Sequence, residues 1–137
     1  MKRKKLSSGK PPGAARVTLE QVCVLPVTDR EDRRLFQRLL RKHHYLGGFK
    51  AVGGQMSYAA VDGRGNWLAV LLFSAAAKHL KPRDRWFGWT RTQRDRRLSP
   101  VVNNSRFLIL PHAHIANLGS RVLRLSSDRL SADWLAR

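Results

Sequence analysis

Residues 67–75 read WLAVLLFSA, a nearly unbroken run of apolar side chains. The apolar stretch that contains them ends at Ala77, far short of the roughly 20 residues that cross a bilayer. A run of this length is typical of a central strand that is covered on both faces. The sequence therefore predicts a sheet that has this run as its buried middle.

Further strands are expected on both sides of this run. Residues 55–61 alternate well enough for a strand, and residues 62–66 (DGRGN) have the turn chemistry of a hairpin loop. Residues 107–110 are predicted to form a second buried strand, which Pro111 stops. Residues 17–27 are expected to form either a short strand or a packed extended segment. Residues 86–89 are expected to form a short aromatic strand or the end of one, and Asn103-Asn104 is expected to form a turn.

A helix is predicted before the hairpin. Thr28 and Glu31 have the spacing of a capping box, and Gly47 and Gly48 are suited to close the helix. Arginines crowd the remaining helix faces, where they meet solvent or phosphate. The apolar side chains of this predicted helix fall on one stripe, which consists of Leu35, Phe36, Leu39 and Leu40.

The order of the predicted elements gives the fold class. A last helix is expected from about Leu118 to Leu130, with Asn117 as its N-cap, and the basic residues 91–98 are a further helix candidate. The buried stripe of the last helix is Leu118, Val122 and Leu125. We expect an α/β domain over residues 17–137, with a mixed, mostly antiparallel sheet covered by helices. A disordered basic tail, residues 1–16, precedes it and supplies no core side chains.

The charge balance is unusual. Lys and Arg number 27 against 9 acidic residues, a formal net charge of +18. Self-repulsion on this scale lowers stability unless a polyanion supplies counter-charge. Most of the excess is arginine, whose planar fork matches phosphates and base edges. We therefore expect DNA or RNA as the partner, ahead of an acidic protein, and no membrane.

Cys23 is the single cysteine, so no internal disulfide can form, which fits a reducing compartment. The basic N-terminus is not followed by an apolar signal segment. Both observations favour a cytoplasmic protein.

Residues 78–97 are the densest basic patch of the folded region, with eight basic and two acidic side chains, and we expect them to bind phosphate. Aromatic rings beside arginines can stack on bases, and Asn and Arg can read base edges. The alternative to base stacking is that the tryptophans belong to the core. The alternative to base recognition is that the asparagine pair forms a plain turn. The candidate nucleic-acid-binding residues are Arg83, Arg85, Trp89, Arg91, Arg94, Arg97, Asn103, Asn104 and Arg106.

His44 and Asp84 are the catalytic candidates. His44 lies at a predicted helix C-terminus, which favours its charged form, and the alternative is a capping histidine. Asp84 lies between arginines that keep it ionised, and the alternative is a structural ion pair. His112 and His114 have no acid or cysteine near them in sequence, so no metal site is predicted. The sequence offers no paired acids for two-metal phosphoryl transfer, which argues against a nuclease or transposase active site in this chain.

The strand at 107–110, the proline, the loop and the following helix start resemble the acetyl-coenzyme A-binding unit of the GNAT acyltransferases. In that unit, backbone N–H groups at a helix start receive a pyrophosphate. The glycine-rich signature of the family is absent here. No cofactor is therefore expected; an acyl-coenzyme A and a GNAT-like transferase activity are the enzymatic alternative. The corresponding phosphate or cofactor loop is Asn117, Leu118, Gly119 and Ser120.

A second resemblance covers most of the chain, about residues 26–134. Its motifs are residues 44–47 (HYLG), 83–84 (RD), 88–89 (GW), 103–111 (NNSRFLILP), 117–120 (NLGS) and 133–134 (DW). In this order they are similar to the DruA family of the Druantia anti-phage system. The resemblance implies a nucleic-acid-binding component of bacterial defence or of a transposase-like mobile element, with other defence proteins such as a helicase as partners.

Members of that family continue past the Asp-Trp motif with an acidic segment. We therefore expect this chain to lack the family's C-terminal segment, as a minimal variant, a fragment or one part of a split system. A truncated, non-catalytic protein that binds partner proteins is accordingly a third functional alternative.

Overall fold

A computed structural model describes residues 16–50 and 52–137 of the protein. The predicted tail therefore lies, except for Arg16, outside the described residues. In chain order the elements are a 3-10 helix (Leu19–Gln21), β1 (Cys23–Pro26), α1 (Arg30–His43), β2 (Gln55–Val61), β3 (Trp67–Ala75), α2 (Lys81–Phe87), α3 (Arg91–Arg97), β4 (Val102–Ile109) and α4 (Leu118–Leu135).

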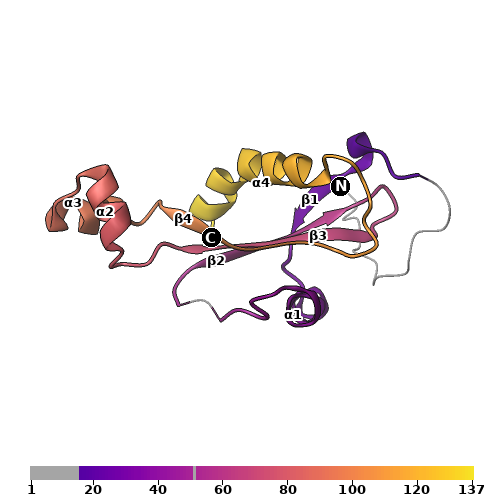
Figure 1. The fold of residues 1–137 in the computed structure, drawn as a ribbon, viewed down its shortest axis with the longest axis horizontal. Coiled ribbons are helices and arrows are strands. Elements are labelled where there is room, and N and C mark those ends of the chain that lie inside the picture. The colour runs from indigo at the N-terminus through magenta and orange to yellow at the C-terminus, as the bar shows by residue number, and fades with distance from the viewer. Residues whose placement is uncertain (1–15, 51) are drawn as a thin grey trace.

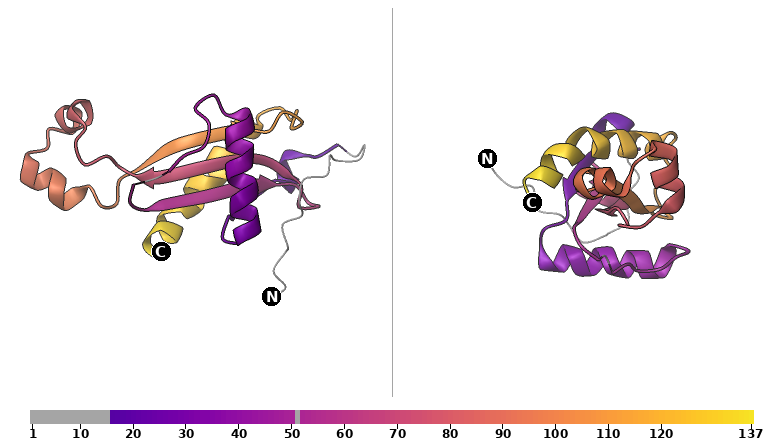
Figure 2. Two further views of the ribbon diagram at one scale, coloured as in Figure 1. Left: turned by 90° about the horizontal axis from the view of Figure 1, so that it is seen from below. Right: turned by 90° about the vertical axis from the view of Figure 1, so that its left-hand side faces the viewer.

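The strands form one sheet in the order β1-β2-β3-β4, and every neighbouring pair is antiparallel. α1 crosses one face of the sheet and α4 covers the other, which gives three layers (Figures 1 and 2). β3 lies between β2 and β4, and its side chains are buried from Trp67 to Ser74. The predicted α/β class and the buried central strand are confirmed. No helix in the described part of the chain is long and apolar enough to cross a membrane.

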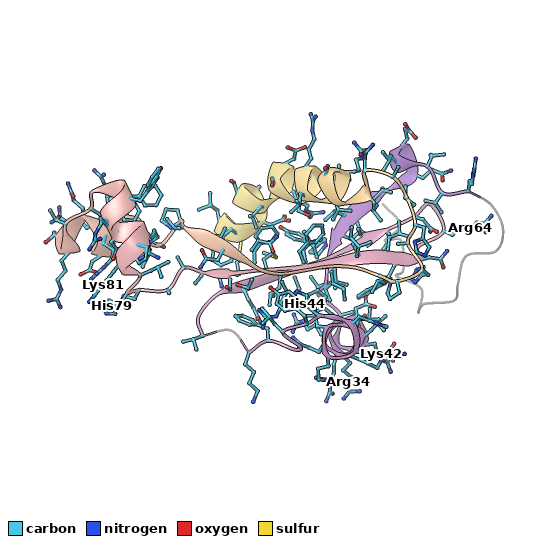
Figure 3. All side chains as sticks on the ribbon, viewed as in Figure 1. Arg34, Lys42, His44, Arg64, His79 and Lys81 are labelled. Atoms are coloured by element: carbon cyan, nitrogen blue, oxygen red, sulfur yellow. The ribbon has the colours of Figure 1, made fainter. Side chains whose placement is uncertain are left out.

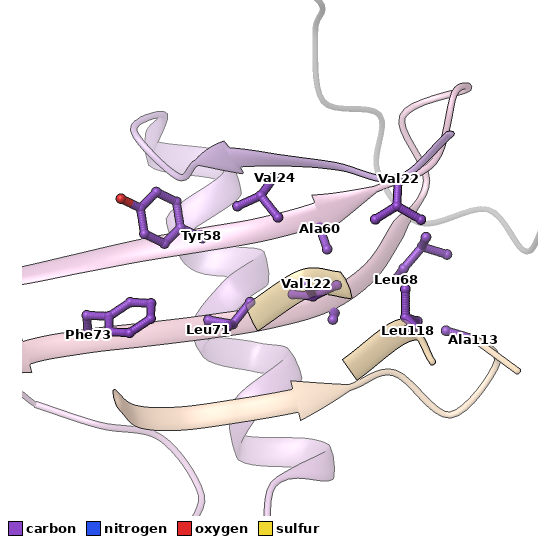
Figure 4. Packing of buried hydrophobic residues seen from close by; sticks show 11 residues of the cluster. Val22, Val24, Tyr58, Ala60, Leu68, Leu71, Phe73, Ala113, Leu118 and Val122 are labelled. Atoms are coloured by element: carbon purple, nitrogen blue, oxygen red, sulfur yellow. The ribbon is translucent and has the colours of Figure 1, made fainter. Parts of the chain in front are cut away.

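The core has two halves because successive side chains of a strand point to opposite faces. On the α4 side, Leu71 and Tyr58 pack with Leu118 and Val122 (Figure 4). On the α1 side, three residues of β3, Trp67, Val70 and Leu72, pack with Phe36 and Leu40 of α1. Full burial of one such aliphatic or aromatic side chain contributes roughly 1.5–3 kcal/mol. The predicted stripe of α1 is thus divided, with Phe36 and Leu40 buried and Leu35 and Leu39 at its margin.

Some predicted boundaries are wrong. The N-cap of α1 is Asp29 rather than Thr28, and its side chain accepts a hydrogen bond from the Glu31 backbone N–H at 3.1 Å. Asn117 does precede α4, but with a left-handed φ of 61° and no side-chain cap bond. α4 continues past Leu130 to Leu135 because its last turns still carry side chains that contact the sheet.

The largest difference lies between β3 and β4. Residues 86–89 are not a strand, since Trp86 and Phe87 end α2 and Gly88 caps it with a left-handed φ of 64°. Asn103-Asn104 is not a turn but part of β4. The connection between these strands is a projecting helical arm, residues 76–101. It is closed at its base by the Ala76 N–H, which donates to the Val101 carbonyl at 3.1 Å.

Candidate nucleic-acid interface

The arm extends from one end of the sheet, away from the three layers (Figures 1 and 2). It contains α2 and α3, and neither helix has a buried residue. Local signals shape it: a proline in the first turn of α2, and a capping box between Thr90 and Gln93 at α3. Because these two helices place no residue in the core, their composition is not set by core packing.

Asp84 holds the two helices of the arm together. Its Oδ1 accepts hydrogen bonds from Arg83, at 2.8 Å from Nη2 and 3.1 Å from Nε. Its Oδ2 accepts from Arg94 Nη1 of α3 at 3.4 Å. Arg83 also donates to the Ala77 carbonyl at 2.7 Å, and Arg94 contacts Asp95 at 3.2 Å. Both arginines are therefore engaged inside the arm.

The environment of Asp84 favours a structural role. Desolvation raises the pKa of this carboxyl, but the hydrogen bonds and charges of Arg83 and Arg94 outweigh it and hold the pKa below its usual value. A carboxylate stabilised in this way is a weak base. The geometry thus supports the ion-pair interpretation of Asp84 over the catalytic one.

The remaining cations of the arm are directed to solvent. With eight basic and two acidic residues, residues 78–97 carry a net charge of +6. Two of the eight, Arg83 and Arg94, pair with Asp84 and Asp95. Six are exposed and have no ion pair among residues 16–50 and 52–137: Lys78, Lys81, Arg85, Arg91, Arg96 and Arg97.

The aromatic rings of the arm differ in exposure. Trp89 is half-buried, and its ring stacks on Phe87 with centroids 4.7 Å apart and planes 18° apart. Trp86 is 87% exposed. From the sequence, Trp89 is a candidate site residue and Trp86 is not. A helix over residues 81–87 places Trp86 next to Arg85 on an element without a core face.

α1 carries a second basic surface, none of whose residues is among the candidate site residues predicted from the sequence. Its exposed cations at every fourth position lie on one face of the helix over about 18 Å. They have no ion pair within the described part of the chain, whereas both aspartates of α4 pair with arginines four residues away. This basic stripe consists of Arg30, Arg34, Arg38 and Lys42.

One cation of the arm lies on the same side of the view in Figure 3 as part of the basic stripe of α1. Figure 3 shows Arg34 and Lys42 of α1 on the side away from the sheet, and His79 and Lys81 of the arm on that same side of the view.

Arg106 does not belong to the arm. It is paired with Leu72 in the β3–β4 register, so its side chain points toward the α1 layer. There its Nε donates to the Gly47 carbonyl at 3.2 Å, and its guanidinium lies 4.8 Å from the centroid of the Phe49 ring. Arg106 thus fixes the loop after α1 to the edge of the sheet.

His44 lies beside this contact as the C-cap of α1 (Figure 3). Its Nδ1 accepts from the Leu46 N–H at 3.1 Å, and its ring stacks on Tyr45 with centroids 4.8 Å apart. Desolvation, followed by the charge of Arg106, lowers the pKa of His44. A mostly neutral imidazole at pH 7 follows, which argues against a charged phosphate contact and fits the capping alternative.

Asn103 and Asn104 are both exposed at the base of the arm, but they lie on opposite faces of β4. Asn103 is paired with Ser74 and Asn104 with Phe73, and the register then shifts by one residue between Phe73 and Leu72. Neighbouring residues on a strand point in opposite directions. The two amides therefore cannot contact the same base.

The proposed phosphate loop at the start of α4 is partly closed. Leu118 is buried, and a Cβ at Gly119 would meet Ile109 at 3.4 Å, while Asn117 and Ser120 are exposed. These contacts seat the helix start against β4. The strand-loop-helix order is present, and the GNAT-like transferase activity stays a prediction.

No group of three potential metal ligands occurs among the described residues. Of the two neighbouring histidines, His112 lies with Nε2 2.9 Å from the Trp67 carbonyl, to which the ring N–H can donate, and His114 is exposed.

One polar network was not anticipated. The Tyr58 hydroxyl donates to Asp133 Oδ2 at 2.7 Å, and Arg129 donates to both oxygens of Asp133. Arg129 Nη1 also donates to the Val24 carbonyl at 2.8 Å. The network joins the end of α4 to β1 and β2, so its role is structural.

The family model described as Druantia protein DruA matches residues 3–137 of this sequence. Neither a curated protein nor a solved structure matches it.

Proposed function

Because the chain belongs to the DruA family of the Druantia anti-phage defence system, we propose that it binds nucleic acid for that system. Its role is in antiviral defence, together with other Druantia components. In this proposal the arm is the primary binding surface, and the basic stripe of α1 adds contacts to the phosphate backbone.

The observation that carries the proposal is the set of six exposed, unpaired cations on the arm. Asp84 pairs with both Arg83 and Arg94 and thereby connects α2 to α3, so the other cations are presented on a braced support. Cations held in this way repel one another, and a phosphate backbone relieves that repulsion and releases bound counterions. An anionic partner is therefore the physical complement of this surface.

The composition and spacing favour nucleic acid over an acidic protein. Four of the six cations are arginines, Arg85, Arg91, Arg96 and Arg97, whose guanidinium groups can bind phosphate oxygens in pairs. The regular four-residue spacing on α1 offers a line of charge rather than a pocket, which suits a polymer with regularly spaced phosphates.

The proposal distinguishes residues that contact phosphate from residues that support them. In the proposal the exposed arginines Arg85, Arg91, Arg96 and Arg97 contact phosphate directly. Arg83 and Arg94 act through Asp84, and Arg106 acts through the loop at Gly47. Replacing a supporting residue would mix loss of binding with loss of structure, so the test uses exposed, unpaired arginines only.

The test measures affinity for labelled single- and double-stranded DNA and RNA between about 50 and 200 mM salt. The variant Arg91→Gln/Arg96→Gln/Arg97→Gln removes three charges without removing an ion pair. Each phosphate contact contributes about 0.9 to the slope of log affinity against log salt on duplex DNA and about 0.7 on single strands. We expect the slope of the triple variant to shrink by roughly 2 to 3.

The matched control is Arg124→Gln, which removes an exposed arginine from α4 on the other side of the sheet. Arg124 already lies 3.9 Å from Asp128, and we expect its slope to equal that of the wild type. The proposal is wrong if the wild type binds no nucleic acid at low salt, or if the triple variant keeps the wild-type slope.

A further inference from the structure

Trp86 is a large aromatic side chain that lies outside the hydrophobic core. It is 87% exposed on α2, a helix with no buried residue. It lines a shallow, open pocket of about 490 Å³, together with Lys81, Pro82 and Arg85. The walls of the pocket are therefore one indole ring, one proline ring and two cationic side chains.

The chemistry of these walls restricts the ligand. The charges of Lys81 and Arg85 repel cations, so the indole does not serve as a cation-binding ring here. A complementary ligand has a flat apolar face for Trp86 and an anionic group within reach of the two cations. A nucleotide has both parts, because its base can stack on an aromatic ring while its phosphate meets a basic side chain.

The base must be accessible from its face. In a duplex each base face is covered by its neighbours, and exposing it costs a few kcal/mol of unstacking and unpairing. Single strands, loops and ends offer such faces without that cost. A stacking ring beside cations therefore discriminates between unpaired and paired nucleic acid, whereas cations alone do not.

We propose that the arm recognises unpaired nucleotides, with one base stacked on Trp86 and the adjacent phosphates bound by Lys81 and Arg85. This inference rests on the proposed function and adds the substrate class to it. DNA and RNA strands share this chemistry, and the test below compares them.

Neighbouring contacts support a preformed site. Phe87 and Trp89 stack on each other on either side of the Gly88 cap, so the chain directly after Trp86 is packed. Asp84, two residues before Trp86, fastens α2 to α3. A ring held on a braced helix loses less conformational freedom on binding than a ring on a loose loop.

The test measures affinity of wild type, Trp86→Ala and Trp86→Phe for a single strand and for the matching duplex, each as DNA and as RNA. Stacking of one base on a protein ring is worth about 5- to 150-fold in affinity. We expect Trp86→Ala to lose single-strand affinity within this range and to keep duplex affinity within about twofold. Trp86→Phe retains a ring and should recover most of the lost affinity.

Tryptophan fluorescence gives a second measurement. Trp86 is the most exposed of the four tryptophans, and a stacked base quenches an indole. Quenching by a saturating single strand should be smaller in Trp86→Phe than in the wild type although both bind. A matched control is Leu135→Ala, which truncates an exposed apolar side chain at the end of α4 and should leave both affinities unchanged.

The possible failures are distinguishable. If the wild type binds no nucleic acid at low salt, the proposed function and this inference both fall. If the wild type binds, but Trp86→Ala loses no single-strand affinity or loses duplex affinity equally, the inference alone is overturned. Because Trp86 is outside the core, unchanged thermal melting of each variant confirms that a loss of affinity is not a loss of fold.

Discussion

Replacing Asp133 by asparagine should destabilise the protein far more than replacing Asp128 by asparagine. Both aspartates lie on α4 and both pair with the arginine four residues before them, Arg129 and Arg124. They differ in what surrounds them. Asp133 also accepts from the buried Tyr58 hydroxyl, and Arg129 continues to a carbonyl of β1. Among residues 16–50 and 52–137, the pair at Asp128 makes no hydrogen bond or ion pair to another element.

The magnitude follows from exposure and hydrogen bonding. The Arg129 and Asp133 side chains are 33% and 24% exposed, whereas Arg124 and Asp128 are 79% and 66% exposed. A hydrogen bond to a charged group contributes about 1.5–3 kcal/mol when buried, and partial solvent access reduces this. We expect a loss of about 2 kcal/mol for Asp133→Asn, or about 8 °C in Tm, and less than about 0.5 kcal/mol for Asp128→Asn.

The assay is urea unfolding at 25 °C, followed by thermal melting across a pH series. The hydrogen bond from Arg129, opposed by desolvation and aided by the hydrogen bond from Tyr58, lowers the pKa of Asp133 from 3.8. A carboxyl with a lowered folded-state pKa stabilises the fold above its unfolded pKa, and this contribution is lost as pH falls through the folded pKa. The difference between wild type and Asp133→Asn should therefore be constant near neutrality and shrink below about pH 4.

Two results would refute this reasoning. Equal stability losses in the two variants would mean that burial and the Tyr58 contact add nothing to the ion pair. A stability difference that stays unchanged down to the acid limit would mean that the Asp133 charge is not its source. In neither variant should the nucleic-acid salt slope change, because both aspartates are on α4.

Two further outcomes test the core and the arm. Leu71→Ala should cost about 2–5 kcal/mol in urea unfolding because Leu71 is fully buried in β3, whereas the exposed Leu135→Ala should cost less than about 0.5 kcal/mol. Asp84→Asn should speed proteolytic cleavage within residues 76–101, because Asp84 joins α2 to α3, while the melting temperature of the three-layer core changes little. The control is Asp95→Asn, which removes a partner of Arg94 only and should be cleaved at the wild-type rate. Because the pKa of Asp84 is lowered, with desolvation outweighed by its arginine bonds, the wild-type arm should also become protease-sensitive as pH falls below the usual aspartate range.

Local patterns were enough for the main features of the fold. The apolar run at 67–75 predicted the central strand because a strand covered on both faces accepts apolar side chains at nearly every position. Stripes at helical spacing identified α1 and α4, and turn residues 62–66 located the hairpin. The ordered motifs from residue 44 to residue 134 carried the family, which the match over residues 3–137 confirms.

Short segments were ambiguous where local rules compete. Residues 86–89 are aromatic enough for a strand, and four residues do not distinguish a strand from the end of a helix. Gly88 in a left-handed cap ends α2 there. The asparagine pair similarly suits a turn by composition, but pairing with β3 draws both residues into β4. At Asn103-Asn104 pairing with β3 overrode local propensity, whereas at residues 86–89 the local helix cap decided the structure.

Only the tertiary structure decided which charged groups are free to act. Composition by itself predicted an anionic partner and identified residues 78–97 as the densest basic segment of the folded region. It did not show that Arg94 reaches Asp84 ten residues away, or that Arg106 is held by Gly47, 59 residues away. Such contacts depend on strand register and on how helices cross, which join residues distant in sequence. Charge is a property of the residue, whereas its availability is a property of its neighbours in the fold.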